Sequence, residues 1–315
     1  MRIFANPNYN FIKWRWHALI LSLALIWGGV GSMWLRGGLP LGIDFSGGTS
    51  VVLQFNQPTS EDVVRKALDP VSTDKVVQKF GTANQNQIMV RLPMMKGQEE
   101  GTNLEAGVTQ VTEALQRANV GQFTVVSKDL VGPTVGADLR TKGIYATLFA
   151  LAGILVYVAF RFRFTFAVGA IVATFHDILI TLVFLSWFGY DLSLNVIAAI
   201  LTITGYSVND TIVVFDRVRE NQRLMRREPL DQIVNKSVNQ TLGRTIITSG
   251  CTLLAVLSLY LFGGEVLRAF AFTMIIGVVT GTYSTVFIAA AIAIILSRRP
   301  PSQGAVAQPV RAKRA

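Results

Sequence analysis

The chain has 315 residues, of which 51% are apolar and only 15% are charged. Because a soluble globular protein carries about 25% charged residues, this composition argues against a soluble protein and indicates a membrane protein. The net charge of +10 lies outside residues 36–142, which carry 11 basic and 11 acidic side chains. Basic residues at the ends of apolar stretches act as topology anchors, and this placement argues against nucleic acid as a partner.

The first apolar stretch, residues 18–35, follows a basic N-terminal segment at 1–17. Lys13 and Arg15 directly precede the stretch, so the positive-inside rule predicts a cytoplasmic N-terminus. No small-residue cleavage pattern is present between Gly28 and Arg36. We therefore expect a retained membrane anchor rather than a removed signal.

Residues 36–142 predict a folded domain outside the cytoplasm. Strand-like and helical periodicities follow one another in the order βαββαβ, which is typical of a ferredoxin-like α+β domain. The predicted strands cover 50–55, 75–80, 87–92 and 122–127, and the predicted helices cover 59–68 and 103–118. The segment contains neither histidine nor cysteine. We expect it to bind or move a partner rather than to catalyse a reaction.

Five further stretches are long and apolar enough to cross a bilayer, which needs about 20 helical residues. Together with the first stretch they predict six transmembrane helices, at 18–35, 143–160, 164–188, 192–215, 246–262 and 266–296. The basic residues of the remaining loops and ends fit one orientation, with both termini cytoplasmic and residues 36–142 outside. Within the cytoplasmic loop 216–245 the pattern predicts a short amphipathic helix, and the tail 297–315 is predicted to be disordered.

Four ionisable residues lie inside or at the edge of these apolar spans where no structural need for them is evident: His176, Asp177, Asp210 and Arg244. A charge at the centre of a membrane helix costs about 2.5–3.5 kcal/mol, so such residues are rare and usually face the bundle interior. Asp210 and Arg244 should lie at similar depth, and we expect them to form an ion pair. This pair either relays protons or ions, or fixes helix packing as a static contact.

Other polar or small residues of the spans support this interpretation. Asn209 belongs to a polar stripe in which residues recur every seven positions: Asn195, Thr202, Asn209 and Asp216. His176 and Asp177 are adjacent and should point about 100° apart, so we expect that they do not both face one site. No third ligand accompanies them, and no metal or other cofactor is expected. Gly277 and Gly281 form a GxxxG motif, which is typical of close helix packing.

Several segments together resemble the SecF family of protein-export subunits. They are GIDFSGGT at 42–49, FRFR at 160–163, HD at 176–177, GYSVNDTIVVFDRVREN at 205–221, RTIITS at 244–249 and GTYSTVF at 281–287. The resemblance covers nearly the whole chain from Asn10 to about Leu296. The first and fourth segments, in this order and spacing, are the most specific.

The resemblance implies a multi-pass protein of the cell (inner) membrane that pairs with SecD, similar to half of a resistance-nodulation-division transporter. It implies association with the SecYEG channel, SecA and YajC, and use of the proton motive force to complete preprotein translocation. The coupling ion would be H⁺. Asp210 and Arg244 would conduct protons with Asn209 beside them, and His176 and Asp177 are further candidates for that path. Gly42, Asp44, Gly47 and Gly48 would form a structural connection next to the first span.

Two other functions stay open from the residues. One is a proton-coupled half-transporter for small-molecule efflux, although such exporters carry far larger outer domains. The other is a structural subunit that conducts no protons and only stabilises a partner complex. We do not expect an enzyme, because the sequence has no nucleophile with a base, no nucleotide loop and no metal cluster.

Overall fold

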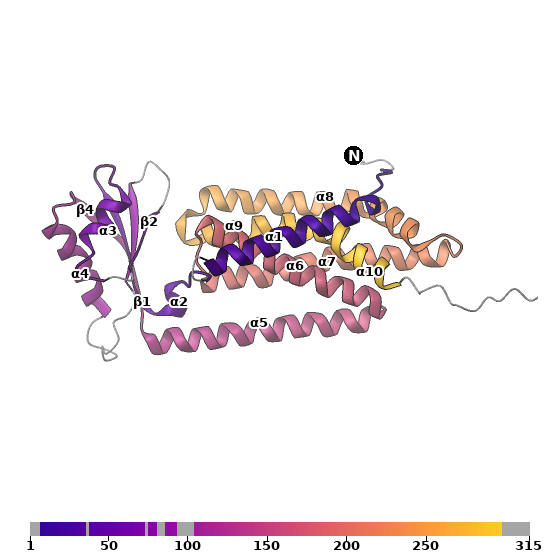
Figure 1. Cartoon of the computed structure of the whole chain (residues 1–315), viewed down its shortest axis with the longest axis horizontal. Coiled ribbons are helices and arrows are strands. Elements are labelled where there is room, and N and C mark those ends of the chain that lie inside the picture. Colours follow the sequence, from indigo (N-terminus) through magenta and orange to yellow (C-terminus); the bar gives the residue numbers. More distant parts are fainter. Residues whose placement is uncertain (1–6, 36–37, 73–74, 81–85, 93–103, 298–315) are drawn as a thin grey trace, which may run out of the picture.

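The computed structural model describes residues 7–35, 38–72, 75–80, 86–92 and 104–297 (Figure 1). A helical bundle occupies most of the length of the molecule, and a small sheet covered by two helices lies at one end. Residues 1–6 of the predicted N-terminal segment and 298–315 of the predicted tail lie outside the described residues. Within the described part of the chain, six helical segments are long and apolar enough to span a membrane, so the chain is a multi-pass membrane protein.

The six spans divide into a buried centre and an exposed periphery. Their helices are α1 (Arg15–Leu35), α5 (Pro133–Arg161), α6 (Phe164–Phe188), α7 (Leu194–Leu224), α8 (Leu230–Phe262) and α9 (Gly264–Ser284) with α10 (Ala290–Ser297). A π-helical turn at Thr285–Ala289 joins α9 to α10 within the sixth span. The apolar windows of α6, α7 and the sixth span are 56%, 50% and 67% buried, against 11–17% for the other three. The central trio therefore forms the core of the bundle.

Three helices extend beyond the limits that hydropathy predicts. α5 begins at Pro133 rather than at residue 143, and α7 continues past residue 215 to Leu224. α8 runs unbroken from Leu230 to Phe262, so the amphipathic segment predicted in the cytoplasmic loop and the fifth span form one helix. Hydropathy marks where a helix is apolar, whereas good helix formers such as Arg, Glu and Gln continue it into water.

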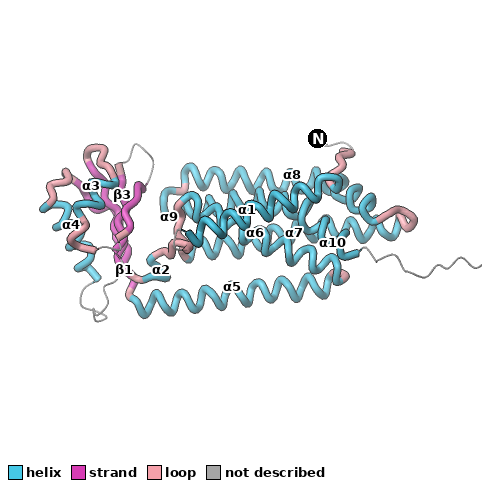
Figure 2. The backbone as a smooth tube through the Cα atoms, in the orientation of Figure 1, coloured by secondary structure: helices cyan, strands magenta, loops and turns pink. Residues whose placement is uncertain are grey.

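The domain that the sequence predicts outside the cytoplasm, here called the outer domain, is a four-stranded antiparallel sheet with two helices on one face (Figure 2). Its elements are β1 (Gly48–Phe55), α3 (Glu61–Ala67), β2 (Val76–Phe80), β3 (Gln87–Leu92), α4 (Leu104–Arg117) and β4 (Phe123–Val131). The strand order is β2-β3-β1-β4. Alternate residues of β1 pack against Val64 of α3 and Val111 of α4 in one buried core. Figure 2 shows both helices on the side of the sheet that faces away from the bundle.

The glycine-rich segment after α1 fastens this domain to the bundle through a short helix, α2 (Ile43–Ser46). An oxygen of Asp44 accepts a hydrogen bond of 2.9 Å from the backbone N–H of Leu194, which caps the start of α7. The backbone N–H of Gly42 donates to the carbonyl oxygen of Leu192 at 2.7 Å. Gly47 and Gly48 have φ values of 68° and 123°, which only glycine adopts without strain. These four residues form a structural connection.

An ion pair makes a second attachment. Arg91 of β3 pairs with Asp191 in the loop between α6 and α7, and their side chains are only 16% and 10% exposed. Burial raises the pKa of the Asp191 carboxyl above its ordinary value, and the adjacent Arg91 opposes this rise without cancelling it. The carboxylate is therefore charged at high pH and takes up a proton as the pH falls through the raised pKa.

We predict that acidification tightens this attachment. The raised pKa of Asp191 belongs to the attached state, in which the carboxyl is buried, so this state binds the proton more tightly than a detached state in which Asp191 is exposed. Spin labels at Lys79→Cys and Leu261→Cys, in a Cys251→Ser background, report the distance between domain and bundle. The distance distribution of the otherwise unchanged protein should narrow as the pH falls through the raised pKa. With Asp191→Asn it should not depend on pH, because the titrating group is gone, whereas Asp138→Asn, which removes a surface carboxylate, should behave like the parent. A distribution that broadens on acidification in the parent, or an unchanged pH dependence with Asp191→Asn, would contradict the prediction.

The GxxxG motif brings α9 against α7. A Cβ atom built on Gly277 would lie 2.3–2.5 Å from three side-chain atoms of Ile203, and one on Gly281 would lie 2.9 Å from the Cβ of Ser207. Both distances are shorter than real carbon contacts, so these positions exclude any larger residue in the present packing. The close approach positions Ser207 against the sixth span.

Gly277→Ala should therefore destabilise the protein by about 1–3 kcal/mol, the usual cost of overpacking. Combining it with Ile203→Ala should cost less than the sum of the two single changes, because the second change makes room for the added methyl. Thermal unfolding in detergent measures this coupling. Gly153→Ala in α5 is the matched control, since nothing lies within 4 Å of a Cβ there. Additive costs at positions 277 and 203 would show that the two residues do not compete for space.

Candidate functional site

Asp210 lies in the bundle interior on α7, with only 8% of its surface exposed. One carboxylate oxygen, Oδ1, accepts a hydrogen bond of 2.8 Å from the hydroxyl of Thr245 on α8. The other oxygen, Oδ2, is buried and has no hydrogen-bond partner among the described residues. A buried acceptor without a partner costs free energy, so the hydrogen-bonding requirement of this carboxylate is only partly met.

The expected ion pair between Asp210 and Arg244 is absent from the described residues. Thr245 rather than Arg244 faces Asp210, and Arg244 lies on the exposed side of α8. The physical reason is helix geometry: adjacent residues point about 100° apart, so only one of the two can face α7. The positive charge of Arg244 is still close enough to act on Asp210 electrostatically.

Asp177 forms a second, fully satisfied buried site. Its Oδ2 accepts hydrogen bonds from the hydroxyls of Ser207 on α7, at 2.5 Å, and of Ser284 on α9, at 2.8 Å. Its Oδ1 lies 2.9 Å from Nδ1 of His176. The expectation that His176 and Asp177 cannot both face one site is wrong, because the two side chains turn toward each other and hydrogen-bond while both stay buried.

His176 extends this site toward α1. Its ring stacks on that of Tyr283 with a centroid distance of 6.1 Å, and the Tyr283 hydroxyl donates to the carbonyl oxygen of Ala18 at 2.8 Å. The Nε2 atom of His176 is buried without a hydrogen-bond partner in the described part of the chain. Asp177 therefore links α6 to α7 and α9 by hydrogen bonds, and His176 contacts Tyr283 of α9 through its ring.

Hydroxyl groups complete a polar layer through the core. Thr211 of α7 and Thr285 of the π-helical turn lie 2.9 Å apart, and Tyr206 of α7 donates to Ser249 of α8 at 3.1 Å. Sequence reasoning missed this set, because Ser and Thr are common in membrane helices and form no charge pattern. The usable signal was the spacing: Ser207 and Asp210 are three residues apart and so share one face of α7. The π-helical turn begins beside Ser284, and such turns often occur at functional sites.

Asn209 does not enter this layer. It lies on the exposed side of α7 together with two other members of the predicted polar stripe, Asn195 and Thr202. The fourth member, Asp216, pairs with Arg161 at the end of α5, at 2.8 Å. The stripe is therefore one helix face, as its spacing predicts, but the face points out of this chain.

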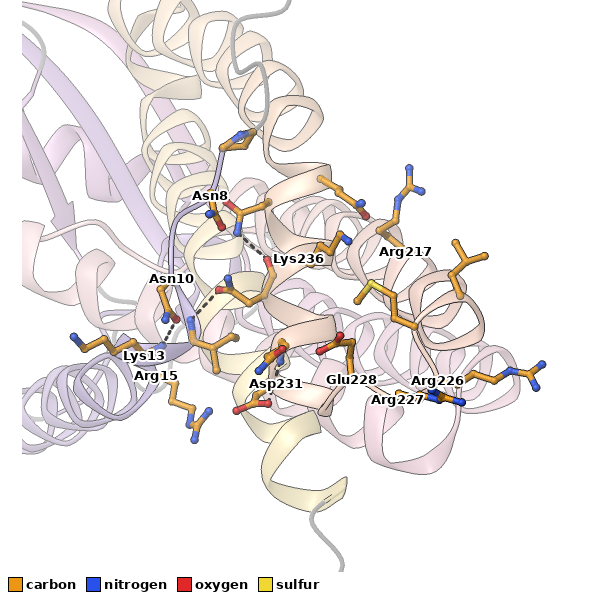
Figure 3. Close-up of a pocket in the computed structure, with 18 of the residues that line it drawn as sticks. Asn8, Asn10, Lys13, Arg15, Arg217, Arg226, Arg227, Glu228, Asp231 and Lys236 are labelled. Carbon is orange, nitrogen blue, oxygen red and sulfur yellow. Dashed lines mark hydrogen bonds between the residues drawn. The ribbon is translucent and has the colours of Figure 1, made fainter.

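A cavity of about 1870 Å³ is separate from these buried groups. Figure 3 shows it between the N-terminal segment, with Asn10 and Lys13, and the start of α8, with Asp231 and Lys236. The backbone carbonyl of Tyr9 accepts hydrogen bonds from the side chains of Asn235 and Asn239, which attach the N-terminal segment to α8. Neither buried acid, nor any side chain that hydrogen-bonds to one, lines this cavity.

Comparison with known proteins agrees with this architecture. Residues 110–299 match the family described as protein export membrane protein SecD/SecF, C-terminal, and residues 34–59 match the SecD/SecF GG motif. The protein translocase subunit SecF of Rhodothermus marinus is 43% identical over 95% of this chain and 96% of its own length. The subunit of the same name from Escherichia coli O157:H7 is 41% identical over 92% of this chain and 88% of its own.

A solved structure is also similar. The crystal structure of SecDF, a translocon-associated membrane protein from Thermus thermophilus, is 35% identical and superposes with a TM-score of 0.81 over 93% of this chain. This chain spans 39% of the length of that SecDF chain. The second of the two family matches covers the glycine-rich connection, and the first covers the spans with the buried acids. The chain therefore belongs to the SecD/SecF family of protein export membrane proteins, and within it to the SecF subunits of the protein translocase.

Proposed function

We propose that this chain works with SecD to convert the proton motive force into completion of preprotein transport through the SecYEG channel, after the step driven by SecA. The observation that carries the proposal is the buried carboxylate of Asp210, which has one hydrogen bond and one unpartnered oxygen. Such a group inside a membrane protein has the features of a proton carrier. The protein would lie in the inner membrane with both termini cytoplasmic, and YajC would join the larger complex.

Pairing with SecD is supported by the exposed polar face of α7. Asn195 and Asn209 are poorly suited to contact lipid, because their side-chain amides would lack hydrogen-bond partners there, whereas the hydroxyl of Thr202 already donates to the carbonyl oxygen of Ala198. Arg244 is exposed on the neighbouring helix α8. A partner subunit covering this face would satisfy these groups and would place Arg244 and Asn209 at the subunit boundary near Asp210.

The two buried acids would have different roles. Asp177 receives hydrogen bonds on both carboxylate oxygens and fits a fixed contact that holds three helices together. Asp210 would take up a proton from the outer side and release it inward, while Arg244 stabilises the charged form electrostatically. One charge crossing the membrane field is worth about 2.3 kcal/mol per 100 mV, which biases a two-state movement more than tenfold.

The outer domain would transmit this movement to the preprotein. Its βαββαβ order and its β2-β3-β1-β4 antiparallel sheet correspond to the ferredoxin-like arrangement that we propose for it. To move a preprotein, this domain would bind and release it without making or breaking covalent bonds. The coupling ion would be H⁺. We therefore propose no enzymatic activity and no other cofactor.

Asp210→Asn should abolish the part of translocation that depends on the proton gradient. In inverted vesicles containing SecD, SecYEG and SecA, we expect completion of translocation to fall to the level measured with a protonophore. Asp216→Asn, which removes a carboxylate near the cytoplasmic end of the same helix, should leave the gradient effect in place. Normal gradient-dependent completion with Asp210→Asn would contradict proton coupling. Reduced copurification with SecD, at unchanged activity per complex, would instead indicate a structural subunit.

Thr245 should act as a positioning residue for Asp210. Thr245→Val removes the hydroxyl that donates to Oδ1, and a hydrogen bond to a charged group is worth about 1.5–3 kcal/mol. We expect at least about a tenfold loss in the rate of gradient-driven completion, and recovery with Thr245→Ser. Failure of Ser to restore the rate would mean that packing, not the hydroxyl, is what matters at this position.

Asp177→Asn should lower stability more than Asp210→Asn does. It removes the charge to which two hydroxyl groups donate, and each hydrogen bond to a charged group contributes about 1.5–3 kcal/mol. Thermal unfolding of the purified complex compares the two variants directly. Equal stability, together with a loss of gradient-driven activity for Asp177→Asn alone, would transfer the proposed proton role from Asp210 to Asp177.

A further inference from the structure

A pocket of about 560 Å³ lies at the cytoplasmic end of the bundle, between the α5–α6 turn and the end of α7. α5 ends at Arg161 and α6 begins at Phe164, so the pocket lies where two spans enter the membrane. Phe160 and Phe164, on either side of the turn, are 89% and 81% exposed. In a membrane these rings contact hydrocarbon chains, and the pocket therefore adjoins lipid.

The rim of the pocket is strongly basic. Five arginines line it: Arg161, Arg163, Arg219, Arg223 and Arg226. Arg219 and Arg223 are four residues apart and so project from one face of α7, and Arg226 follows just after the helix ends. Arg161 is paired with Asp216, but the other four have no carboxylate within ion-pair distance among the described residues. Guanidinium groups that converge without a counter-ion repel one another, and an anion between them removes that repulsion.

The floor of the pocket is aromatic. The Phe215 ring meets the rings of Phe166 and Phe162 edge to face, at centroid distances of 5.0 and 5.9 Å. Phe166 and Phe215 are buried, whereas Phe162 is partly exposed. A phosphate at the rim would thus have an apolar surface directly beside it. Free phosphate makes no use of such a surface, but the acyl chains of a phospholipid do.

The neighbouring larger cavity lacks this combination. Glu228 and Asp231 lie among its basic residues, and Figure 3 shows both acids between Arg15 on one side and Arg226 and Arg227 on the other. Topology alone requires basic residues on the cytoplasmic side, but it does not require arginines on one helix face above an aromatic floor.

We propose that the pocket binds the phosphate group of an anionic phospholipid of the cytoplasmic leaflet, with the arginines around the phosphate and the acyl chains against the phenylalanine rings. Arginine suits this task because its planar fork contacts two phosphate oxygens at once. The lipid would bridge the α5–α6 turn and the end of α7. It would thereby fix α5, one of the least buried spans, to the bundle core.

The test uses the purified full-length chain in complex with SecD. Native mass spectrometry with phosphatidylglycerol or phosphatidylcholine gives the affinity for the first bound lipid. We expect the anionic lipid to bind about tenfold more tightly, and Arg219→Gln with Arg223→Gln to remove this preference. Arg217→Gln with Arg227→Gln removes the same charge from the same segment outside the pocket, and the preference should persist. Equal losses in both double variants, or no preference in the parent, would overturn the proposal.

A second comparison separates a lipid site from a phosphate site. Phe162→Ala should weaken binding of phosphatidylglycerol several-fold, because the acyl chains lose part of their apolar surface. Glycerol phosphate, which carries the same anionic group without chains, should bind only weakly and should be insensitive to this change. If glycerol phosphate or inorganic phosphate displaces the lipid at equal concentration, the site binds phosphate alone and the lipid proposal is wrong.

Discussion

The cost of burying a carboxylate between membrane helices is the constraint on which the rest of this structure depends. Hydrocarbon offers no hydrogen bonds, so each buried acid must find partners on other helices or carry a proton. Asp177 meets the first condition through Ser207, Ser284 and His176, whereas Asp210 meets it only in part, through Thr245. The close contact of α7 with α9, made possible by Gly277 and Gly281, brings the hydroxyl groups within reach.

The same helices that carry the acids also hold the outer domain. Asp177 lies on α6 and Asp210 on α7, and the loop that joins these helices contains Asp191 and Leu192. Asp191 pairs with Arg91 of the sheet, and the backbone of Leu192 bonds to the glycine-rich connection. A change in how α6 and α7 pack therefore reaches the outer domain through a loop of a few residues. The helices that carry the buried acids thus contact the domain through this loop, without an intervening structural element.

The sequence predicts most of this architecture, because long apolar runs and basic flanks are one-dimensional signals. It identifies six spans, the order of strands and helices in the outer segment, and Asp177 and Asp210 as groups that need partners. It does not predict which partners they find, since contacts between helices depend on how each helix is rotated. The charge of Arg244 predicts it as the partner of Asp210, but the adjacent Thr245 is the residue that faces Asp210. Likewise, adjacent helical residues point about 100° apart, but rotation of the two side chains brings His176 within hydrogen-bond distance of Asp177.

The central claim is that Asp210 gains and loses a proton as the protein works. Infrared difference spectroscopy of the SecD complex in oriented membranes measures this directly, by acidifying the outer side alone. The account predicts a protonated-carboxyl band that appears on acidification, is absent with Asp210→Asn and persists with Asp177→Asn. A spectrum in which no carboxyl band depends on Asp210 would contradict it, because that carboxylate would then keep one protonation state throughout the cycle.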